Sequence, residues 1–430
     1  MDRRSFLKGG AALAAAPALA AVTGLSPAFG PAWAAAQDPA NIRNWHPDMH
    51  YRPHGLTGVG VSALGFGMLR LPMQADGKTV DEAKTIPMLR HAIDHGLNYV
   101  DTGYVYLGGQ SEAVTGKALA DGYRDRVWLT SKSPWWIMER PEDFHRFFDE
   151  SRRRLNTDVI DFYHIHMIMH RGWKDKVVPW RLAEKMQDLK AQGKIRFAGF
   201  SFHDGVPLFK RVVDAAPWDF CLIQQNYLDT EHEAGLVGLN YAAANGMGVS
   251  IMEPLRNGFL VRPPAFVQAE LDRAPNKRHP VEWAFDYLWN KPEVSVVVSG
   301  MSSMDNVRDN LAYAGRSAPG MLDAEERAVI GRAARAYRSA PGAIPCTGCY
   351  NCIPCPQNVA IGYLFNMVYN QYRADGDKAR AHRLVNYSMS PVQRGDKPGA
   401  CNDCGQCLPK CPQGIDIPAE LRRIRGELDL

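Results

Sequence analysis

The 430-residue sequence lacks several features that would assign it to a simple functional class. Its net charge of +4 is too small to indicate a nucleic-acid-binding surface. Beyond an N-terminal leader, it has no low-complexity block and no apolar run long enough to cross a bilayer. Cysteine is also nearly absent outside the C-terminal segment: the one exception is Cys221, in an apolar run that predicts a buried side chain. We therefore expect no nucleic-acid partner, and no stable membrane span once the leader is removed.

The leader has the composition of an export signal. Arg3 and Arg4 precede Ser-Phe-Leu-Lys, and an alanine-rich apolar stretch follows. The paired arginines resemble the twin-arginine signal, which implies export of an already folded protein to the periplasm. We predict a signal peptide over residues 1–36, cleaved after Ala34 or Ala36. An uncleaved membrane anchor is the alternative.

The remaining eight cysteines form two runs near the C-terminus. The second run has the spacing of bacterial ferredoxins, and the first differs from it by one residue in its last gap. In such runs three cysteines bind one [4Fe–4S] cluster, and the fourth, followed by proline, binds the other cluster. We therefore expect two [4Fe–4S] clusters and one-electron transfer. The expected ligands are Cys346, Cys349, Cys352 and Cys411 for the first cluster, and Cys401, Cys404, Cys407 and Cys355 for the second.

Two other uses of these cysteines stay open. Structural zinc sites are built from C-x-x-C pairs, whereas here the cysteines come as triplets plus one. Disulfides would fit an oxidising compartment, but neighbouring cysteines in C-x-x-C runs bridge poorly.

Between the leader and the cysteines, short apolar runs alternate with amphipathic ones. This alternation predicts βα units and a parallel sheet, and eight units are the number that closes a (β/α)₈ barrel. A doubly wound open sheet is the alternative, but no G-x-G-x-x-G follows the first strand. The expected strands are Val61–Met68, Leu97–Thr102, Val127–Ser131, Val159–His166, Ile195–Phe202, Phe220–Asn226, Val249–Pro254 and Val294–Gly300.

The predicted fold class is therefore α/β, a (β/α)₈ TIM barrel with a C-terminal α-helical ferredoxin-like iron–sulfur domain. We expect the barrel over residues 50–320, a linking helix over 321–340 and the iron–sulfur domain over 341–430. The expected helices are Asp81–His95, Arg140–Leu155, Trp180–Gln192, Val206–Ala215, Val281–Trp289, Asn306–Ala314, Asp323–Ser339, Tyr363–Arg373 and Ala379–Tyr387.

Polar side chains follow the predicted strands where each strand ends, which is where barrel enzymes place catalytic groups. Three of these segments, residues 98–106, 129–132 and 161–166, resemble the motifs of the aldo-keto reductase family. The resemblance extends from about Tyr51 to Ala314, and the whole chain is similar to the branch with a C-terminal ferredoxin-like domain. The resemblance implies a catalytic tetrad of Asp101, Tyr106, Lys132 and His166. His164 faces the same side of its strand, but the motif places the catalytic histidine at the strand's end.

The chemistry of carbonyl reduction explains these residue types. Hydride addition creates an alkoxide that must take up a proton, and a phenol with a pKa near 10 donates slowly near neutral pH. A lysine ammonium beside it stabilises the phenolate, so Lys132 would make Tyr106 a better donor. Asp101 would keep the lysine charged and oriented, and His166 would shape the carbonyl pocket. The hydride itself would come from a nicotinamide.

The resemblance also implies NADP or NAD as a cofactor, with departures from the common pattern. The usual asparagine after Ser201 is Phe202, and Met252 replaces the aromatic residue that stacks on the nicotinamide. Asn306 stands where an arginine would clamp a 2′-phosphate, which weakens the case for NADP over NAD. The implied cofactor-binding residues are Ser201, Gln224, Met252, Pro254, Leu255, Gly300, Ser302, Asn306 and Asn310.

The sequence thus predicts an exported oxidoreductase that acts on a small carbonyl or alcohol and exchanges electrons with a possible redox partner protein. Tyr104, Trp135, Trp136 and Trp173 suggest an aromatic substrate pocket. No flavin site is recognisable to convert hydride into single electrons. Because export removes the protein from the cytoplasmic NAD(P)H pool, we expect a tightly held nicotinamide that is carried out with the fold. The alternative is an iron–sulfur electron-transfer protein whose barrel is a docking or non-catalytic module.

Overall fold

The computed structural model describes residues 38–388 and 395–430. The predicted signal peptide and its cleavage site lie outside the described residues. Within these two stretches, no helix combines the length and the apolar character needed to span a membrane.

Eight parallel strands close into a barrel, as the sequence predicts. They are β3 (Leu64–Gly67), β4 (Tyr99–Asp101), β5 (Trp128–Ser133), β6 (Ile160–Ile168), β7 (Ile195–Phe202), β8 (Phe220–Gln224), β9 (Gly248–Met252) and β10 (Val296–Gly300). Each strand pairs with its neighbour in chain order, and β10 closes the ring against β3. The polar residues at the strand ends are therefore gathered around one mouth of the barrel.

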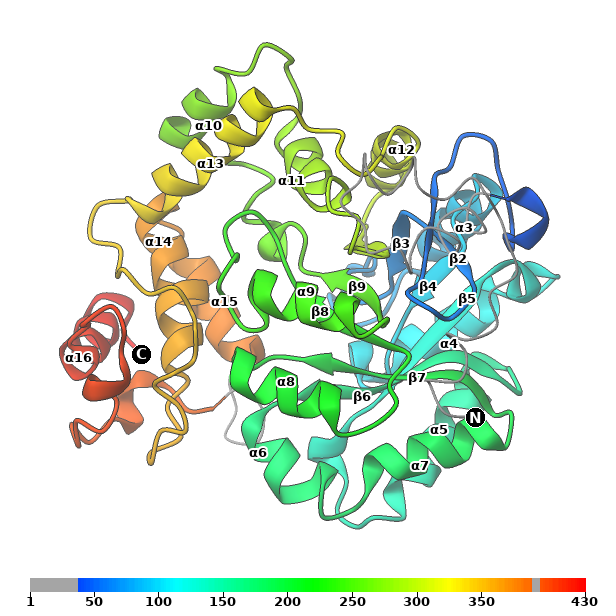
Figure 1. Ribbon diagram of the computed structural model, residues 1–430, viewed down its shortest axis with the longest axis horizontal. Helices are drawn as coiled ribbons and strands as arrows, with labels where there is room; N and C mark the ends of the chain where they lie inside the picture. The colour runs from blue at the N-terminus through cyan, green and yellow to red at the C-terminus, as the bar shows by residue number, and fades with distance from the viewer. Residues whose placement is uncertain (1–37, 389–394) are drawn as a thin grey trace.

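Helices cover the outside of this barrel (Figure 1). They are α3 (Glu82–Asp94), α4 (Gln110–Ala118), α5 (Asp143–Leu155), α7 (Leu182–Ala191), α8 (Val206–Asp214), α9 (Gly235–Ala244), α11 (Pro280–Trp289) and α12 (Met304–Ala314). In α5, Phe144, Phe147, Phe148, Ser151 and Leu155 are buried, at the spacing of one helix face. The charged residues of α5 lie mostly on its other face, so the amphipathic pattern that predicts this helix also docks it on the barrel.

Shorter helical segments lie in the loops. These are η2 (Pro39–Asn41), η3 (Tyr106–Gly109), η4 (Tyr123–Arg126), η5 (Trp135–Ile137), α6 (His170–Gly172), η6 (Trp173–Val177), η7 (Arg256–Gly258), α10 (Ala265–Leu271), η9 (Pro398–Ala400) and η10 (Leu408–Lys410). Of these, η3, η5 and η7 contribute residues to the mouth of the barrel.

A hairpin of β1 (Tyr51–Pro53) and β2 (Gly60–Ser62) closes the N-terminal end of the barrel. His54, in its turn, is fully buried and packs against the rings of Tyr99, Phe162 and Phe220 inside the barrel. Its Nε2 lies 3.1 Å from the hydroxyl of Ser250. Side chains of the described residues thus fill this end of the barrel, and the cavity described below opens at the opposite mouth.

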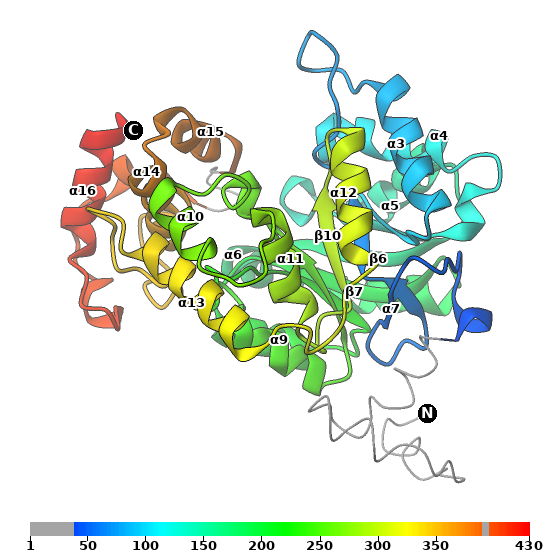
Figure 2. The ribbon, with the colours of Figure 1, turned by 90° about the horizontal axis from the view of Figure 1, so that it is seen from above.

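The C-terminal part of the chain forms a second, smaller core beside the barrel. It begins after α13 (Ala324–Arg338) and contains η8 (Tyr363–Tyr369), α14 (Asn370–Asp375), α15 (Lys378–Ser388) and α16 (Ile417–Leu428). Its core includes Leu364, Val368, Val385, Leu421 and Ile424, all buried. Figures 1 and 2 show these helices on one side of the barrel, with α16 at the outer edge of the molecule.

Candidate functional site

Lys132 lies at the mouth of the barrel, near the C-terminal end of β5. Its side chain is fully buried, and Nζ lies 2.6 Å from Oδ1 of Asp101 and 2.6 Å from the carbonyl oxygen of Thr102. The other carboxylate oxygen of Asp101 accepts a hydrogen bond of 2.8 Å from Oγ1 of Thr130, its partner across the β4–β5 pair. Burial lowers the pKa of Lys132, and the charge and hydrogen bond of Asp101 oppose that effect.

Tyr106 begins η3, and its ring lies against Lys132. The lysine nitrogen is 4.6 Å from the centroid of the phenol ring. Directly after Tyr106 the chain turns through two left-handed residues, Leu107 (φ 51°) and Gly108 (φ 66°). This conformation is unfavourable for leucine, so the turn fixes the tyrosine at the mouth at some cost in backbone energy.

His166 completes the predicted tetrad near the end of β6. Its ring meets the Tyr106 ring edge-on, with centroids 5.5 Å apart, and packs against Trp136 at 4.9 Å. Burial holds the pKa of His166 well below its usual range, and the charges of Lys132 and His203 lower it further. The imidazole is therefore neutral near pH 7.

An irregularity in β6 places His166 in this position. The β6–β7 register shifts between Ile165 and Ile168, and Met167 has a φ of 52°. The amide of Met167 donates a 2.6 Å hydrogen bond to Oγ of Ser201 on β7. His164, which is fully buried against Phe220, does not line the cavity described next, so the structure separates the two histidines.

A cavity of about 780 Å³ opens at the tetrad. All four tetrad residues line it, together with most of the predicted cofactor-binding residues. The latter are Ser201, Met252, Pro254, Leu255, Gly300, Ser302, Asn306 and Asn310. A cavity of this size, with one wall from the β9 and β10 loops, fits a dinucleotide and a small substrate.

Gln224 is the predicted cofactor-binding residue that does not line the cavity. Its Nε2 donates to Oδ2 of Asp229 at 2.9 Å and lies 3.6 Å from the sulfur of Met367 in η8. The side chain therefore contacts the C-terminal core, and in this structure it makes no contact with the cavity.

The structure also separates the four loop aromatics. Trp136 lines the cavity. Trp135 is buried beneath it, and its Nε1 donates to the carbonyl of Met167 at 3.0 Å. Tyr104 packs on Phe147, outside the cavity lining. Trp173 also lies outside the lining, so an aromatic substrate wall rests on Trp136 alone among these residues.

Among the cavity residues that sequence reasoning missed, His203 and Arg70 carry the chemically useful side chains. His203 follows β7, two residues after Ser201, and its position at a strand end was the signal for it. Arg70 follows β3 and lies over Gly300, where an added Cβ would meet Cγ of Arg70 at 2.8 Å. Neither belongs to a motif that the resemblance emphasises.

The eight clustered cysteines surround two spaces in the C-terminal core. One is lined by Cys346, Cys349, Cys352 and Cys411, and the other by Cys355, Cys401, Cys404 and Cys407 together with Cys352. Among residues 38–388 and 395–430, no three histidine, cysteine or acidic side chains are close enough to hold a single metal ion. A cubane binds each thiolate through a different iron, so it needs thiols further apart than one ion does.

Burial raises the pKa of the Cys346 thiol to about 11, and it also raises the pKa values of Cys352 and Cys407. Thiols in such surroundings are neutral at pH 7 unless a metal centre stabilises the thiolate. The donor set, eight soft sulfur ligands around two spaces, therefore fits iron–sulfur clusters.

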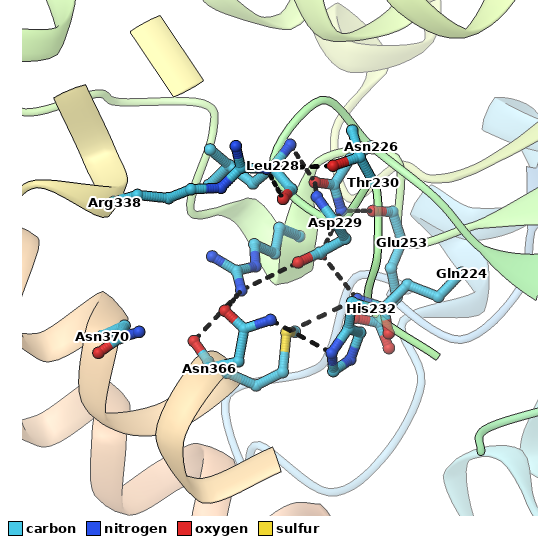
Figure 3. A network of polar contacts seen from close by, with 12 residues as sticks. Gln224, Asn226, Leu228, Asp229, Thr230, His232, Glu253, Arg338, Asn366 and Asn370 are labelled. Atoms are coloured by element: carbon cyan, nitrogen blue, oxygen red, sulfur yellow. Dashed lines mark hydrogen bonds and ion pairs between the residues drawn. The ribbon is translucent and has the colours of Figure 1, made fainter. Parts of the chain in front are cut away.

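A buried polar network joins the barrel to this core (Figure 3). Arg256, in η7, pairs with Asp229 at 3.0 Å and donates to Oδ1 of Asn366 in η8 at 2.7 Å. Nδ2 of Asn366 lies 3.2 Å from Nδ1 of His232. The amide of Glu233 donates to the carbonyl of Gly348, in the first cysteine run, at 3.1 Å. The loop after β8 thus holds the first cysteine run, and the loop after β9 holds η8.

Three family models match the chain. The aldo/keto reductase family matches residues 63–319, a 4Fe–4S dicluster domain matches residues 345–415, and a twin-arginine translocation signal matches residues 1–20. They confirm the predicted barrel family, the iron–sulfur domain in place of zinc or disulfides, and the export signal.

Similar proteins agree with the first match. The chain is 30% identical over 284 residues to an L-galactose dehydrogenase of Arabidopsis thaliana, covering 61% of this chain and 86% of that protein. It is 36% identical over 162 residues to the aldo-keto reductase YhdN of Bacillus subtilis, covering 36% and 47%. Among solved structures, the aldo-keto reductase AKR11C1 of Bacillus halodurans in its holo form superposes with a TM-score of 0.57. That structure is 27% identical, and the match covers 67% of this chain and 97% of that one.

Together these findings describe an oxidoreductase with an iron–sulfur domain and a signal for export. The aldo/keto reductase match covers more than half of the chain, and the barrel places the four residues of the predicted tetrad around one cavity. The chain therefore belongs to the aldo/keto reductase family.

Proposed function

We propose that this protein transfers hydride between a tightly held nicotinamide and a small carbonyl or alcohol in the periplasm, and that two [4Fe–4S] clusters link the reaction to an external redox partner. The barrel over residues 50–320 would carry the chemistry. A linking helix over 321–340 would connect it to the cluster domain over 341–430.

The observation that carries this proposal is the burial of Lys132 between Asp101 and Tyr106 at the cavity mouth. An ammonium group is seldom fully buried unless it is paired, and this one is 2.6 Å from a carboxylate and 4.6 Å from a phenol ring. A structural ion pair would not need the phenol or the cavity beside it. The arrangement suits a proton donor whose phenolate form must be stabilised.

In this scheme the bound nicotinamide supplies the hydride. Tyr106 donates the proton that the developing alkoxide requires, and Lys132 stabilises the phenolate left behind. Asp101 orients the lysine. His166, neutral because of burial, donates or accepts a hydrogen bond at the carbonyl without adding a charge.

The cavity wall supports binding of the cofactor. Met252, beside the tetrad, would cover the nicotinamide ring with a polarizable sulfur. At the other end, Arg70 lies over Gly300, and Asn306 in the first turn of α12 lines the same cavity. An arginine and a helix N-terminus both favour phosphate. Arg308 is exposed and pairs with Asp305 at 3.6 Å on the same helix, so no clamp for a 2′-phosphate is formed there.

The cysteine positions support the crossed ligand sets. We assign Cys346, Cys349, Cys352 and Cys411 to a first cluster next to the barrel. Cys355, Cys401, Cys404 and Cys407 would hold a second cluster, which is nearer solvent because Cys404 is exposed. Electrons would then pass between the cavity, the first cluster, the second cluster and the partner protein, in that order or its reverse.

One observation favours a second candidate function, an iron–sulfur electron-transfer protein with a non-catalytic barrel. Gln224, expected to bind the nicotinamide carboxamide, is instead held by Asp229 and Met367. A barrel that had lost its cofactor could keep Gln224 as a docking residue.

The test is iron and sulfide analysis of the purified protein, with visible spectra before and after NADPH or NADH and a carbonyl reduction assay. Tyr106→Phe should lower the carbonyl reduction rate by about 10²–10⁴, the usual contribution of a proton donor. Tyr104→Phe is the matched control, because Tyr104 lies outside the cavity lining. Full activity of Tyr106→Phe would favour the second candidate. Absence of nicotinamide from the supernatant of the denatured exported protein would contradict a tightly held cofactor.

A further inference from the structure

His203 and Glu233 form a buried pair beside the tetrad. His203 follows β7 and lines the cavity, whereas Glu233 comes from the loop between β8 and α9. Nδ1 of the imidazole lies 3.1 Å and 3.0 Å from the two carboxylate oxygens. The two residues are 7% and 1% exposed. A charged or polar pair is seldom placed in such a position without a function or a compensating partner.

The pair has a defined protonation pattern. Burial would raise the pKa of Glu233, but His203 and His232 outweigh burial and hold that pKa well below its usual range. A carboxylate can only accept hydrogen bonds, so Nδ1 of His203 carries the hydrogen that lies between them. Nε2 then carries no hydrogen and is the ring nitrogen that can accept a proton.

His166 cannot serve the same purpose. Burial and the charges of Lys132 and His203 all lower the pKa of His166, and no acidic residue raises it. Its Nδ1 has no hydrogen-bond partner among the described residues. The cavity therefore holds two histidines with different environments, one kept neutral and one backed by a carboxylate. Such a difference assigns acid–base work to the second.

The proposed function requires a second proton site. Oxidation of an alcohol by one-electron acceptors follows R₂CHOH → R₂C=O + 2 H⁺ + 2 e⁻. The O–H proton goes to the phenolate of Tyr106. The carbon-bound hydrogen would leave as hydride to a bound nicotinamide, and two oxidised clusters would each accept one of its two electrons, so one further proton would be released. Tyr106 already holds one proton, so another base at the cavity must accept this one.

The pair is also next to the path of the electrons. The amide of Glu233 donates to the carbonyl of Gly348, which lies between Cys346 and Cys349. A Cβ added at Gly348 would lie 2.2 Å from Nδ1 of His232. The loop that carries Glu233 therefore contacts the first cysteine run directly.

We propose that His203, held by Glu233, is a second proton-transferring residue of the cavity, and that it takes up the second proton when alcohol oxidation delivers electrons singly to the clusters. Glu233 is a positioning residue that fixes the tautomer. This inference rests on the proposed function, because it concerns only alcohol oxidation that is coupled to reduction of the clusters.

The first experiment compares two reactions in the cluster-loaded protein. His203→Gln should lower alcohol oxidation, measured by cluster bleaching in stopped flow, by about 10²-fold. Carbonyl reduction by added NADPH or NADH uses the proton of Tyr106, so its loss in His203→Gln should be smaller than the loss of bleaching by about tenfold or more. His203→Ala should regain bleaching when free imidazole is added, which a merely structural role would not allow. Equal losses in both reactions, or no loss in either, would overturn the proposal.

A spectroscopic test is independent of turnover. Nitrogen-15 NMR of histidine-labelled protein with oxidised clusters should show His203 with hydrogen on Nδ1 in the wild type, and a mixture of tautomers in Glu233→Gln. Wild-type protein with a mixed tautomer would overturn the role of Glu233. Failure of the proposed function itself is recognised separately, since the wild type would then show no nicotinamide-dependent carbonyl reduction at all.

Discussion

Arg256 pairs with Asp229 at the boundary between the barrel and the iron–sulfur core. The guanidinium nitrogen lies 3.0 Å from the carboxylate, and the two side chains are 4% and 0% exposed. The same guanidinium holds Asn366 of η8 at 2.7 Å, and Asp229 accepts hydrogen bonds from Asn226 and Gln224. This one ion pair therefore fixes both the β8 loop and the docked core (Figure 3).

Removing one member of this pair should destabilise the protein strongly. Arg256→Met leaves the carboxylate of Asp229 buried without its counter-charge, which costs about 3–5 kcal/mol. Urea unfolding of the cluster-loaded protein measures the change. Arg181→Met is the matched control, since Arg181 and Glu184 are 75% and 55% exposed and such pairs contribute about 0–1 kcal/mol. Equal losses of unfolding free energy in the two variants would show that the buried pair contributes no more to stability than the exposed pair.

The docking of the first cysteine run can be tested at a glycine. Gly348 has a φ of +74°, and an added Cβ would lie 2.2 Å from Nδ1 of His232. Gly376 has the same φ, but an added Cβ would meet nothing within 4 Å. Both alanine variants should lose about 1–2 kcal/mol of unfolding free energy, because alanine disfavours the left-handed backbone conformation. Gly348→Ala alone should also slow nicotinamide-driven bleaching of the clusters, because the loop must move away from the barrel. Equal bleaching rates in the two variants would contradict this role.

The eight strands and the tetrad were predictable because each depends on a short, contiguous segment. Asp101 and Lys132 follow apolar runs, so the barrel alone brings them together. The expected strand Val61–Met68 is in fact two elements, β2 and β3. Ser62 belongs to the hairpin and donates its amide to the side chain of Asn98. Apolar character along the chain does not reveal which sheet a strand will join.

Helices without an amphipathic pattern could not be predicted from the sequence. The segment that forms α9 is apolar nearly all round and contains Gly235 and Gly238, and α4 also shows little periodicity. Both helices are determined by their position between strands in the barrel, which overrides weak local preference.

The contacts that the barrel loops make around the site could not be predicted from the sequence. Glu233 and Arg256 lie in loops after different strands, and only the closed barrel places them near His203 and Asn366. Gln224 matched the family pattern, but contacts with other segments redirect its side-chain amide. Its Nε2 donates to Asp229 and lies beside the sulfur of Met367, which the docked η8 provides. Contacts between two cores are absent from any local pattern.

The buried histidines should make the protein sensitive to acid. Burial lowers the pKa of His54 to about 3, whereas an unfolded histidine titrates near 6.5. Above about pH 6.5 both states are neutral and stability is unaffected. Below it only the unfolded state takes up the proton, so stability falls until about pH 3. At pH 5 the loss from His54 is about 2 kcal/mol, from 1.36 kcal/mol per pH unit.

Urea unfolding followed by tryptophan fluorescence at pH 7.5 and pH 5 measures this loss. His54→Gln keeps a partner for Ser250 but removes the ionisation, so the difference between the two pH values should shrink by about 2 kcal/mol. His50→Gln, at an exposed position, should leave the difference unchanged. An unchanged difference in His54→Gln would show that the imidazole is not kept neutral by the barrel.

The crossed ligand sets predict a pattern of non-additive cysteine substitutions. If Cys355 and Cys404 bind the same cluster, the double variant Cys355→Ser with Cys404→Ser should lose one cluster and keep about half of the iron. The double variant Cys355→Ser with Cys349→Ser should lose both clusters, because its two cysteines belong to different sets. If instead each run holds its own cluster, the two iron contents are exchanged. Iron and sulfide analysis separates these outcomes, and electron paramagnetic resonance of the reduced variants shows whether the retained cluster is intact. The spatial grouping favours the crossed sets, since Cys411 lies with the first run and Cys355 with the second.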